Sequence, residues 1–157
     1  LIMKQLFLLR HGEAGFSQDS DFQRQLTIKG RENLIRMGKS LLGKLNSVDL
    51  MYCSPAKRTM ETADLIQKSI TVKDSIYTKD IYQGDLNDMI SILEKTSPSV
   101  ESCLFVGHNP TISLLLSHIS SENYLGMQPG MMAIIELEIE DWKMIGFGTG
   151  ILKEIIQ

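Results

Sequence analysis

The sequence predicts an α/β fold whose central sheet is mixed but mostly parallel. Two observations lead to this prediction. Short apolar runs typical of buried strands alternate with segments of helical periodicity, which is the pattern of successive βαβ units. Residues 132–141 instead alternate apolar with acidic side chains, which indicates a strand with one solvated face. Such a strand belongs at an edge or an antiparallel end of the sheet.

The first half of the chain shows strand and helix signals in turn. The expected elements are a buried strand at 5–10, a polar loop at 17–30, a helix starting within that stretch and covering 28–45, a strand at 49–54 and a helix that ends near 68. Thr27 suits the N-cap of the first helix, because its hydroxyl can accept a hydrogen bond from a free backbone N–H group. Ser54 and Pro55 have the residue types of an N-cap and a first helical position.

The second half continues the alternation. The expected elements are a strand at 75–82, a helix at 85–96, a strand at 102–107, a helix through 112–119, a strand at 132–141 and a partner strand within 142–152. Asn109 and Pro110 repeat the cap-then-proline pattern in front of the helix through 112–119. The antiparallel pair at the end makes the predicted sheet mixed.

Length and composition fit one globular domain over residues 1–157, with 43% hydrophobic and 22% charged residues. Leu1 and Ile2 precede Met3, and we expect these two residues to be remnants of expression cloning. No apolar run approaches the roughly 18 residues of a membrane span, and the start of the chain lacks the basic n-region and cleavage site of a signal peptide. We therefore expect a cytoplasmic protein that does not enter a membrane.

The two cysteines, Cys53 and Cys103, both lie in strand-like runs. Their spacing fits neither a zinc site nor a disulfide framework. We therefore expect two buried free thiols, as is usual in a reducing compartment.

The net charge of −3 argues against a nucleic-acid-binding protein. The charge is distributed unevenly, with 13 Lys/Arg and 8 Asp/Glu in residues 1–79 but 3 and 11 in residues 80–157. A basic first half could steer an anionic substrate towards the protein, or it could be a bias of surface composition alone. The sequence leaves both explanations open.

Basic and imidazole side chains follow three of the predicted strands at the point where each strand ends. The first strand runs into Arg10 and His11, the second is followed by a helix that carries Arg58, and the third ends just before His108. Ligands of open α/β sheets bind beyond the carboxyl ends of the strands. Each of these side chains alone has an ordinary structural explanation, but their joint placement predicts one shared site.

The residue types in this predicted site suit a phosphoryl group. The planar guanidinium of arginine matches phosphate oxygens, and the helix N-termini expected nearby add N–H groups and partial positive charge. Neighbouring cations disfavour the imidazolium form, so at least one histidine would be neutral at pH 7 and able to act as a nucleophile. Two histidines without a set of carboxylate or cysteine ligands make a poor metal site, so we expect no metal.

Four segments of the chain resemble motifs of the histidine phosphatase superfamily, the group that includes cofactor-dependent phosphoglycerate mutases and histidine acid phosphatases. "LLRHGEA" (8–14) resembles the family's opening motif, "SPAKRTMETA" (54–63) its second and "VGHNPTIS" (106–113) its third. "DFQRQLTIKG" (21–30) resembles the D-x-x-R-x-L-T-x-x-G segment of the SixA-type phosphohistidine phosphatase branch.

This resemblance implies a three-layer sandwich and a role for each matching residue. His11 would be the nucleophile and become transiently phosphorylated, while Arg10, Arg58 and His108 surround the phosphoryl group. No metal or organic cofactor would be required. Gly12 would let backbone approach closely at the turn after the nucleophile.

The general acid is the one part of the family's pattern that has no clear match. Larger members place a Glu or Asp between the second and third motifs, where this chain offers Asp80, Asp85 and Asp88. Asp85 also fits an N-cap, which is the interpretation we favour for it. Glu13 is a further candidate, or a residue of the turn.

The leading hypothesis is hydrolysis of phosphohistidine on a protein, such as a histidine phosphotransfer domain of a signalling relay. Imidazole, which protonates at about 6.5, needs much less proton donation on leaving than an alcohol does. Two alternatives remain: a phosphatase for small phosphate monoesters, and a catalytically weak phosphate-binding module.

Overall fold

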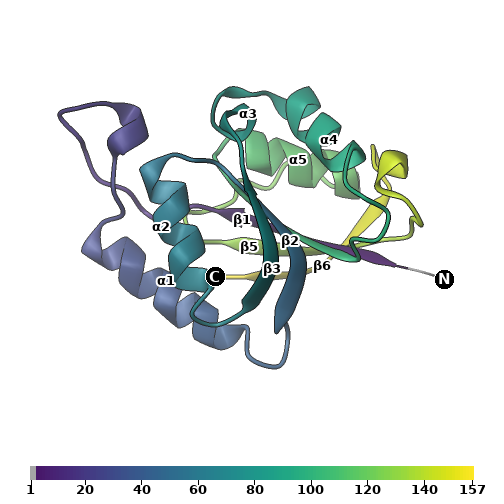
Figure 1. Cartoon of the computed structure of the whole chain (residues 1–157), viewed down its shortest axis with the longest axis horizontal. Helices are drawn as coiled ribbons and strands as arrows, with labels where there is room; N and C mark the ends of the chain where they lie inside the picture. The colour runs from purple at the N-terminus through teal and green to yellow at the C-terminus, as the bar shows by residue number, and fades with distance from the viewer. Residues whose placement is uncertain (1–2) are drawn as a thin grey trace.

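The computed structural model describes residues 3–157, so the expectation for Leu1 and Ile2 lies outside the described residues. Strands and helices alternate along most of the chain, as predicted (Figure 1). The elements are β1 (Lys4–Arg10), η1 (Asp21–Gln23), α1 (Ile28–Ser40), β2 (Ser47–Cys53), α2 (Lys57–Ile66), β3 (Thr71–Tyr77), α3 (Lys79–Gln83), α4 (Leu86–Glu94), β4 (Ser102–Gly107), α5 (Thr111–Ser120), β5 (Met132–Leu137), η2 (Trp142–Met144) and β6 (Gly150–Ile156).

The strands form one mixed sheet in the order β3-β2-β4-β1-β5-β6. Strands β3, β2, β4 and β1 pair in parallel, whereas β5 runs antiparallel to both β1 and β6. The predicted mixed sheet with a parallel majority is therefore confirmed. The antiparallel strands are the last two of the chain, where the alternating pattern of residues 132–141 placed them.

The central strands are apolar throughout because both faces of the sheet are covered. On β1, Leu6 and Leu8 pack with residues of α4 and α5, whereas Phe7 and Leu9 pack with residues of α1 and α2. All four side chains are at most 1% exposed. Figure 1 shows α1 and α2 together on one side of the sheet and α4 with α5 on the other. These helices complete the three layers.

The two helices of the first half differ from their predicted bounds. Thr27 is the N-cap of α1, as predicted, and its hydroxyl accepts a hydrogen bond from the Gly30 N–H. The helix ends at Ser40 rather than near 45, and Gly43 has a left-handed φ of 81° in the turn that follows. The predicted cap of α2 is wrong, because Ala56 occupies the N-cap position, while the Ser54 hydroxyl accepts from the Ala56 backbone N–H and also contacts His108.

The strand predicted at 75–82 is wrong in its bounds. Strand β3 begins earlier and ends at Tyr77, after which Thr78 caps the short helix α3. The helix turns the side chain of Ile81 into the core, where it is 2% exposed. As the edge strand of the sheet, β3 is mostly solvated and so carries a weak apolar pattern.

The last third of the chain also departs from its predicted bounds. Helix α5 begins at Thr111 with Pro110 at the N-cap position, one residue later than the sequence pattern indicated. Strand β5 ends at Leu137, because β6 begins opposite that residue at Gly150. Between them, Asp141 caps the short helix η2, whose Trp142 is fully buried and donates a hydrogen bond from its indole N–H to the Val100 carbonyl.

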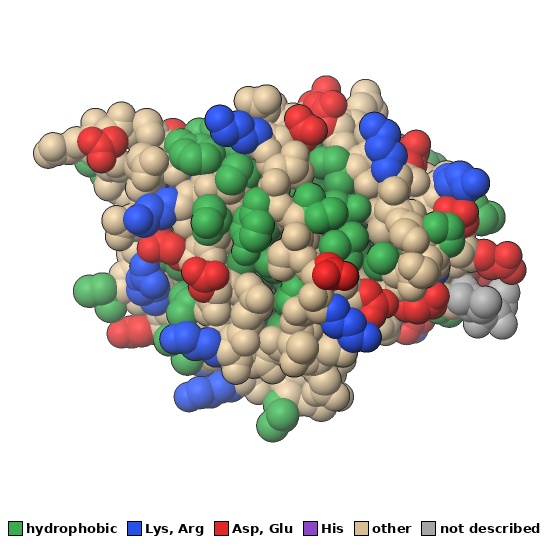
Figure 2. Space-filling model, in the orientation of Figure 1, with side chains coloured by type: hydrophobic (Ala, Val, Ile, Leu, Met, Phe, Trp, Pro, Cys, Tyr) green, Lys and Arg blue, Asp and Glu red, His purple; other side chains and the backbone are tan. Residues whose placement is uncertain are grey.

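The surface mixes charges of both signs. Figure 2 shows Lys and Arg side chains interspersed with Asp and Glu on the face it displays, rather than the one-sided basic surface typical of a nucleic-acid-binding protein. Cys53 and Cys103 are buried free thiols, as predicted. Among residues 3–157, no helix is both long enough and apolar enough to cross a membrane.

Candidate active site

Three adjacent strands end level with one another at one edge of the sheet. Strand β4 lies between β2 and β1, and its register places Gly107 beside Arg10 and Val106 beside Cys53. The next residue of each strand therefore emerges at the same edge. The backbone N–H groups of His11 and Ser54 continue this pairing by donating to the carbonyls of Gly107 and Val106.

His11 presents one ring nitrogen to the site and uses the other as an anchor. Its Nδ1 lies 2.7 Å from the carbonyl oxygen of Gly12, which can only accept, so Nδ1 carries the proton. Its Nε2 is then an acceptor, and it receives a hydrogen bond from Nε of Arg58 at 3.3 Å. The lone pair of Nε2 thus faces the cationic side chain, in the tautomer that a nucleophile requires.

His108 lies beside His11, with 5.2 Å between the ring centroids. Its Nε2 is 2.7 Å from the hydroxyl of Ser54, and its Nδ1 accepts from Nη2 of Arg58 at 3.3 Å. Because Nδ1 accepts from a guanidinium, the proton sits on Nε2 and is donated to Ser54. The Ser54 hydroxyl, which also accepts from the Ala56 backbone N–H, therefore orients this ring.

Burial keeps both imidazoles neutral. Desolvation is the largest cause that lowers the pKa of His11 to about 4, and the charges of Arg58 and Arg10 lower it further. Desolvation likewise lowers the pKa of His108 to about 3, and repulsion between the protonated forms of His108 and His11 and from the Arg58 cation lowers it further. The predicted neutral histidine is confirmed, although burial rather than the neighbouring cations is the main cause.

Arg58 joins the two histidines from the first turn of α2. Its side chain is 7% exposed, and its Nε and Nη2 atoms contact the two rings. The opposite side of the guanidinium contacts Asp21 of η1, whose backbone oxygen accepts from Nη1 at 2.8 Å and whose carboxylate accepts from Nη2 at 3.1 Å. Arg58 is thus a buried arginine held between the strand edge and a surface loop.

Arg10 is the last residue of β1. Its Nη1 donates to the carbonyl of Met127 at 2.8 Å, which ties it to the loop before β5. Its Nε is the one buried side-chain nitrogen or oxygen of residues 3–157 that has no hydrogen-bond partner. The structure therefore brings His11, Arg58 and His108 into contact, while Arg10 adjoins His11 in the chain and its charge lowers the pKa of that imidazole.

Sequence reasoning missed three residues of this site: Asp21, Tyr82 and Ser54. The Tyr82 hydroxyl donates to Asp21 Oδ2 at 2.7 Å, and its ring packs edge-on against His108, with centroids 5.5 Å apart. The hydrogen bond from Tyr82 is the largest of the contacts that hold the pKa of Asp21 far below its usual range. The only sequence signal for Asp21 was its position at the head of the "DFQRQLTIKG" segment.

The candidate general acids are engaged in local structure. Asp85 is the N-cap of α4, as we favoured, and forms a capping box with Asp88. The Glu13 carboxylate accepts from the Thr27 hydroxyl at 2.9 Å, beside the start of α1. Asp80 is an exposed residue in the first turn of α3. As general acids, these residues remain predictions.

Gly12 is needed for packing at the turn after His11. A Cβ atom on this residue would lie 2.8 Å from the Leu34 side chain of α1. The backbone N–H of Gly12 donates to the Thr62 hydroxyl of α2. The glycine therefore lets the turn lie against two helices at once.

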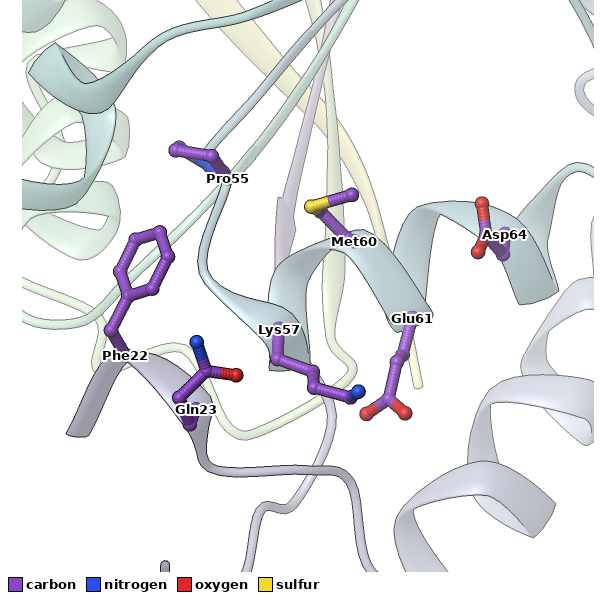
Figure 3. Close-up of a pocket in the computed structure, with 7 residues that line it drawn as sticks. All are labelled: Phe22, Gln23, Pro55, Lys57, Met60, Glu61 and Asp64. Atoms are coloured by element: carbon purple, nitrogen blue, oxygen red, sulfur yellow. The ribbon is translucent and has the colours of Figure 1, made fainter. Parts of the chain in front are cut away.

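A pocket of about 460 Å³ lies between η1 and α2, and neither histidine nor Arg58 is among its lining residues (Figure 3). Phe22 and Gln23 face Pro55, Lys57 and Met60 across it. Its lining residues are sequence neighbours of the polar site, since Phe22 follows Asp21 and Lys57 precedes Arg58. Residues 3–157 contain no cluster of three His, Cys, Asp or Glu side chains that could hold a metal ion.

Comparison with known families gives a match over residues 6–90, more than half of the chain, to the histidine phosphatase superfamily (branch 1). The chain belongs to this superfamily. The match includes the His11 turn, the Asp21 loop and Arg58. Family membership, together with the phosphohistidine phosphatase relatives described next, identifies the protein as a phosphatase, which is a hydrolase of phosphate groups.

Other members of the histidine phosphatase superfamily resemble the chain over most of its length. A phosphohistidine phosphatase SixA homolog of Haemophilus influenzae is 27% identical over 82% of this chain and 85% of its own length. Phosphohistidine phosphatase SixA of Escherichia coli is 25% identical over 73% of each chain. A solved structure of the protein histidine phosphatase SixA with tungstate has a TM-score of 0.84 at 22% identity, covering 98% of this chain and 96% of the other, and thus shares the fold.

Proposed function

We propose that this phosphatase hydrolyses phosphohistidine on a partner protein, with His11 as nucleophile. One observation carries the proposal: Nε2 of His11 is an unprotonated acceptor that faces the guanidinium of Arg58, with His108 beside it. A neutral nucleophile beside fixed positive charge is what attack on an anionic phosphoryl group requires. The names of the SixA relatives support phosphohistidine as the substrate.

In the first step, the lone pair of His11 Nε2 attacks the phosphorus atom of the substrate. A bond forms between Nε2 and phosphorus while the bond from phosphorus to the substrate imidazole nitrogen breaks, and that nitrogen keeps the electron pair. The substrate ring, protonated on its other nitrogen, leaves as neutral imidazole. The His11 ring gains positive charge as it attacks. The hydrogen bond from Nδ1 to the Gly12 carbonyl stabilises this charge, so the same bond both orients the ring and favours its attack.

Arg10, Arg58 and His108 would stabilise the phosphoryl oxygens during transfer. The Nε–H of Arg10, which has no partner among residues 3–157, is available to donate to an oxygen. The Nε and Nη2 atoms of Arg58 turn towards the histidines and can donate side by side. These fixed donors stabilise the charge of the transferring group.

In the second step, water attacks the phosphorus atom of phosphorylated His11. The bond from phosphorus to Nε2 breaks, inorganic phosphate leaves with the added oxygen, and neutral His11 is regenerated. The low pKa of His11 favours this outcome, because the ring is released without holding a second proton.

Phosphohistidine fits this site better than a phosphate monoester does. An alkoxide leaving group, whose alcohol resembles water with a pKa of about 15.7, needs a strong general acid, whereas imidazole protonates at about 6.5. The nearby carboxylate of Asp21 has a strongly lowered pKa and so holds no proton to donate at neutral pH. Asp85 and Glu13 accept hydrogen bonds in a helix cap and a turn.

A protein substrate also fits the surroundings of the site. The pocket between η1 and α2 is lined by the sequence neighbours of Asp21 and Arg58, and it offers space for side chains that flank a phosphohistidine on a partner's surface (Figure 3). We propose a histidine phosphotransfer domain of a cytoplasmic signalling relay as this partner. The reaction uses no metal and no organic cofactor.

The test compares the wild type and His11→Ala on a phosphohistidine-bearing protein and on a panel of small phosphomonoesters. The wild type should hydrolyse phosphohistidine at least a hundredfold more efficiently in kcat/KM than any monoester, and His11→Ala should lose turnover. Rapid quenching should trap an alkali-stable phosphohistidine on the wild-type enzyme alone. Preferred hydrolysis of a monoester would replace the proposed substrate, and near-wild-type activity of His11→Ala would remove His11 from its role. Phosphate binding without turnover would identify a binding module.

A further inference from the structure

We infer that Asp21 is a positioning residue that sets the orientation of Arg58 in the site. The inference rests on the proposed function, because it concerns how the same phosphoryl group is bound. Asp21 lies on the 3-10 turn η1 of the surface loop between β1 and α1, and its carboxylate does not contact the histidines directly. It would act through the arginine.

Asp21 holds one edge of the guanidinium at two points. Its backbone oxygen accepts from Nη1, and its Oδ2 atom accepts from Nη2. A planar group held twice along one edge has a fixed plane and a fixed direction for its remaining N–H bonds. Those bonds, on Nε and Nη2, point to His11 and His108.

The carboxylate is itself held in place by two further donors. The Tyr82 hydroxyl donates to Oδ2 at 2.7 Å, and Nη1 of Arg24 donates to Oδ1 at 3.0 Å. Arg24 is anchored in turn by the bond from its Nε to the Gly15 carbonyl, at 2.7 Å. The ring of Tyr82 packs between Phe22 of η1 and His108. These contacts therefore hold the Asp21 carboxylate in one orientation, in which it accepts the hydrogen bond from Arg58.

Burial differs sharply between the two partners. The Arg58 side chain is 7% exposed, whereas that of Asp21 is 52% exposed. Exposure means that loss of the Asp21 carboxylate leaves no cavity in the core. Arg58, in contrast, would lose its charged partner and one of the two contacts that fix its plane. The effect of an Asp21 substitution should therefore appear in anion binding and catalysis more than in stability.

Asp19 provides a matched control. It carries the same charge on the same loop, it is exposed, and its carboxylate makes no hydrogen bond or ion pair with any residue in 3–157. Asp19→Ala and Asp21→Ala change the net charge equally, so a difference between them reports the specific contact with Arg58. Asp21→Asn keeps an acceptor oxygen without the charge and tests whether geometry alone is sufficient.

The experiment measures tungstate binding by calorimetry, phosphohistidine hydrolysis and thermal unfolding for the wild type and these three variants. Asp21→Ala should weaken tungstate binding and lower kcat/KM at least tenfold, with the loss mainly in kcat. Asp21→Asn should stay within about threefold of the wild type, and Asp19→Ala within twofold. Melting temperatures should change little. Should Asp21→Ala fail to fold, Asp21→Ser, which also removes the carboxylate, takes its place with the same tenfold loss expected, and unchanged tungstate binding by that variant would overturn the inference.

Unchanged or tighter tungstate binding by Asp21→Ala would overturn the inference. Tighter binding would mean that the carboxylate competes with the anion for Arg58 instead of orienting it. Equal losses in Asp21→Ala and Asp19→Ala would also overturn it, since the effect would then be one of general charge. Tungstate binding does not depend on the substrate, so absence of phosphohistidine hydrolysis in the wild type would refute the proposed function while this measurement still tests Asp21.

Discussion

The protonation of His11 offers the sharpest quantitative test of the site. Burial, with the charges of Arg58 and Arg10, lowers the pKa of this imidazole to about 4, whereas an exposed histidine titrates at about 6.5. At pH 5, a group with a pKa of about 4 is about 90% neutral, and one with a pKa of about 6.5 only about 3% neutral. If His11 is the nucleophile, the two cases differ about thirtyfold in active enzyme at pH 5.

The same shift predicts how stability depends on pH. Between pH 6.5 and 4 the unfolded chain binds a proton at His11 that the folded protein does not, so the free energy of unfolding falls as the pH falls through this window. A difference of about 2.5 units corresponds to roughly 3 kcal/mol from this residue. This contribution is fully present above pH 6.5 and is lost by about pH 4.

The assay is NMR titration of the His11 ring from pH 3.5 to 8, assigned with His11→Gln and referenced to the urea-unfolded protein. Initial rates, corrected for uncatalysed hydrolysis, and unfolding free energies are measured over the same range. Arg58→Gln should raise the pKa of His11 but leave it below 6.5, because burial rather than the cation is the largest cause of the shift. Titration of His11 within half a unit of 6.5 in the wild type would refute this reasoning.

Four further predictions concern Arg58, Asp85, Gly30 and metal ions. Arg58→Ala should weaken vanadate inhibition at least tenfold, because charge-assisted hydrogen bonds contribute about 1.5–3 kcal/mol; an unchanged inhibition constant would place this arginine outside the site. Asp85→Asn should change phosphohistidine hydrolysis less than twofold, since asparagine is an equivalent N-cap, whereas a loss of about 10²-fold or more would identify Asp85 as a general acid. Gly30→Ala should destabilise the protein by about 1–3 kcal/mol in urea denaturation, because a Cβ atom there would lie 2.4 Å from the backbone oxygen of Glu13; wild-type stability would show that the turn after His11 adjusts freely. Treatment with EDTA should leave initial rates within experimental error, since arginines supply the positive charge, and a loss that Mg²⁺ or Zn²⁺ restores would reveal a metal requirement.

The strands in the middle of the sheet could be predicted from the sequence, whereas its edges could not. Strands β1 and β4 are buried on both faces, so their runs are apolar without interruption and their ends came within a residue of the prediction. Strand β3 lies at the edge and is mostly solvated, which left little apolar pattern to mark its bounds. Helix starts were missed by a residue or two at α2 and α5, where the Ser54 hydroxyl contacts His108 and the Asn109 side chain accepts from the Ser113 hydroxyl.

The members of the site were predictable to the extent that they follow strand ends. Parallel strands in register bring the next residue of each to the same edge, so the positions of His11 and His108 followed from local sequence. Arg58 could be expected nearby because it lies in the first turn of the following helix. Asp21 and Tyr82 follow no strand of the parallel centre directly, and their meeting depends on the path of a loop.

The sequence by itself determined the order of strands and helices, the mixed sheet and which side chains stand where the central strands end, because burial and backbone pairing impose local patterns of residue type. The tertiary structure alone decided the proton positions on the two histidines, the burial that keeps them neutral and the contact of Asp21 with Arg58. These properties depend on how the folded backbone turns at His11 and on which groups distant in the chain come within hydrogen-bonding distance. Hydrogen bonds and desolvation depend on those distances rather than on the residue types along the chain.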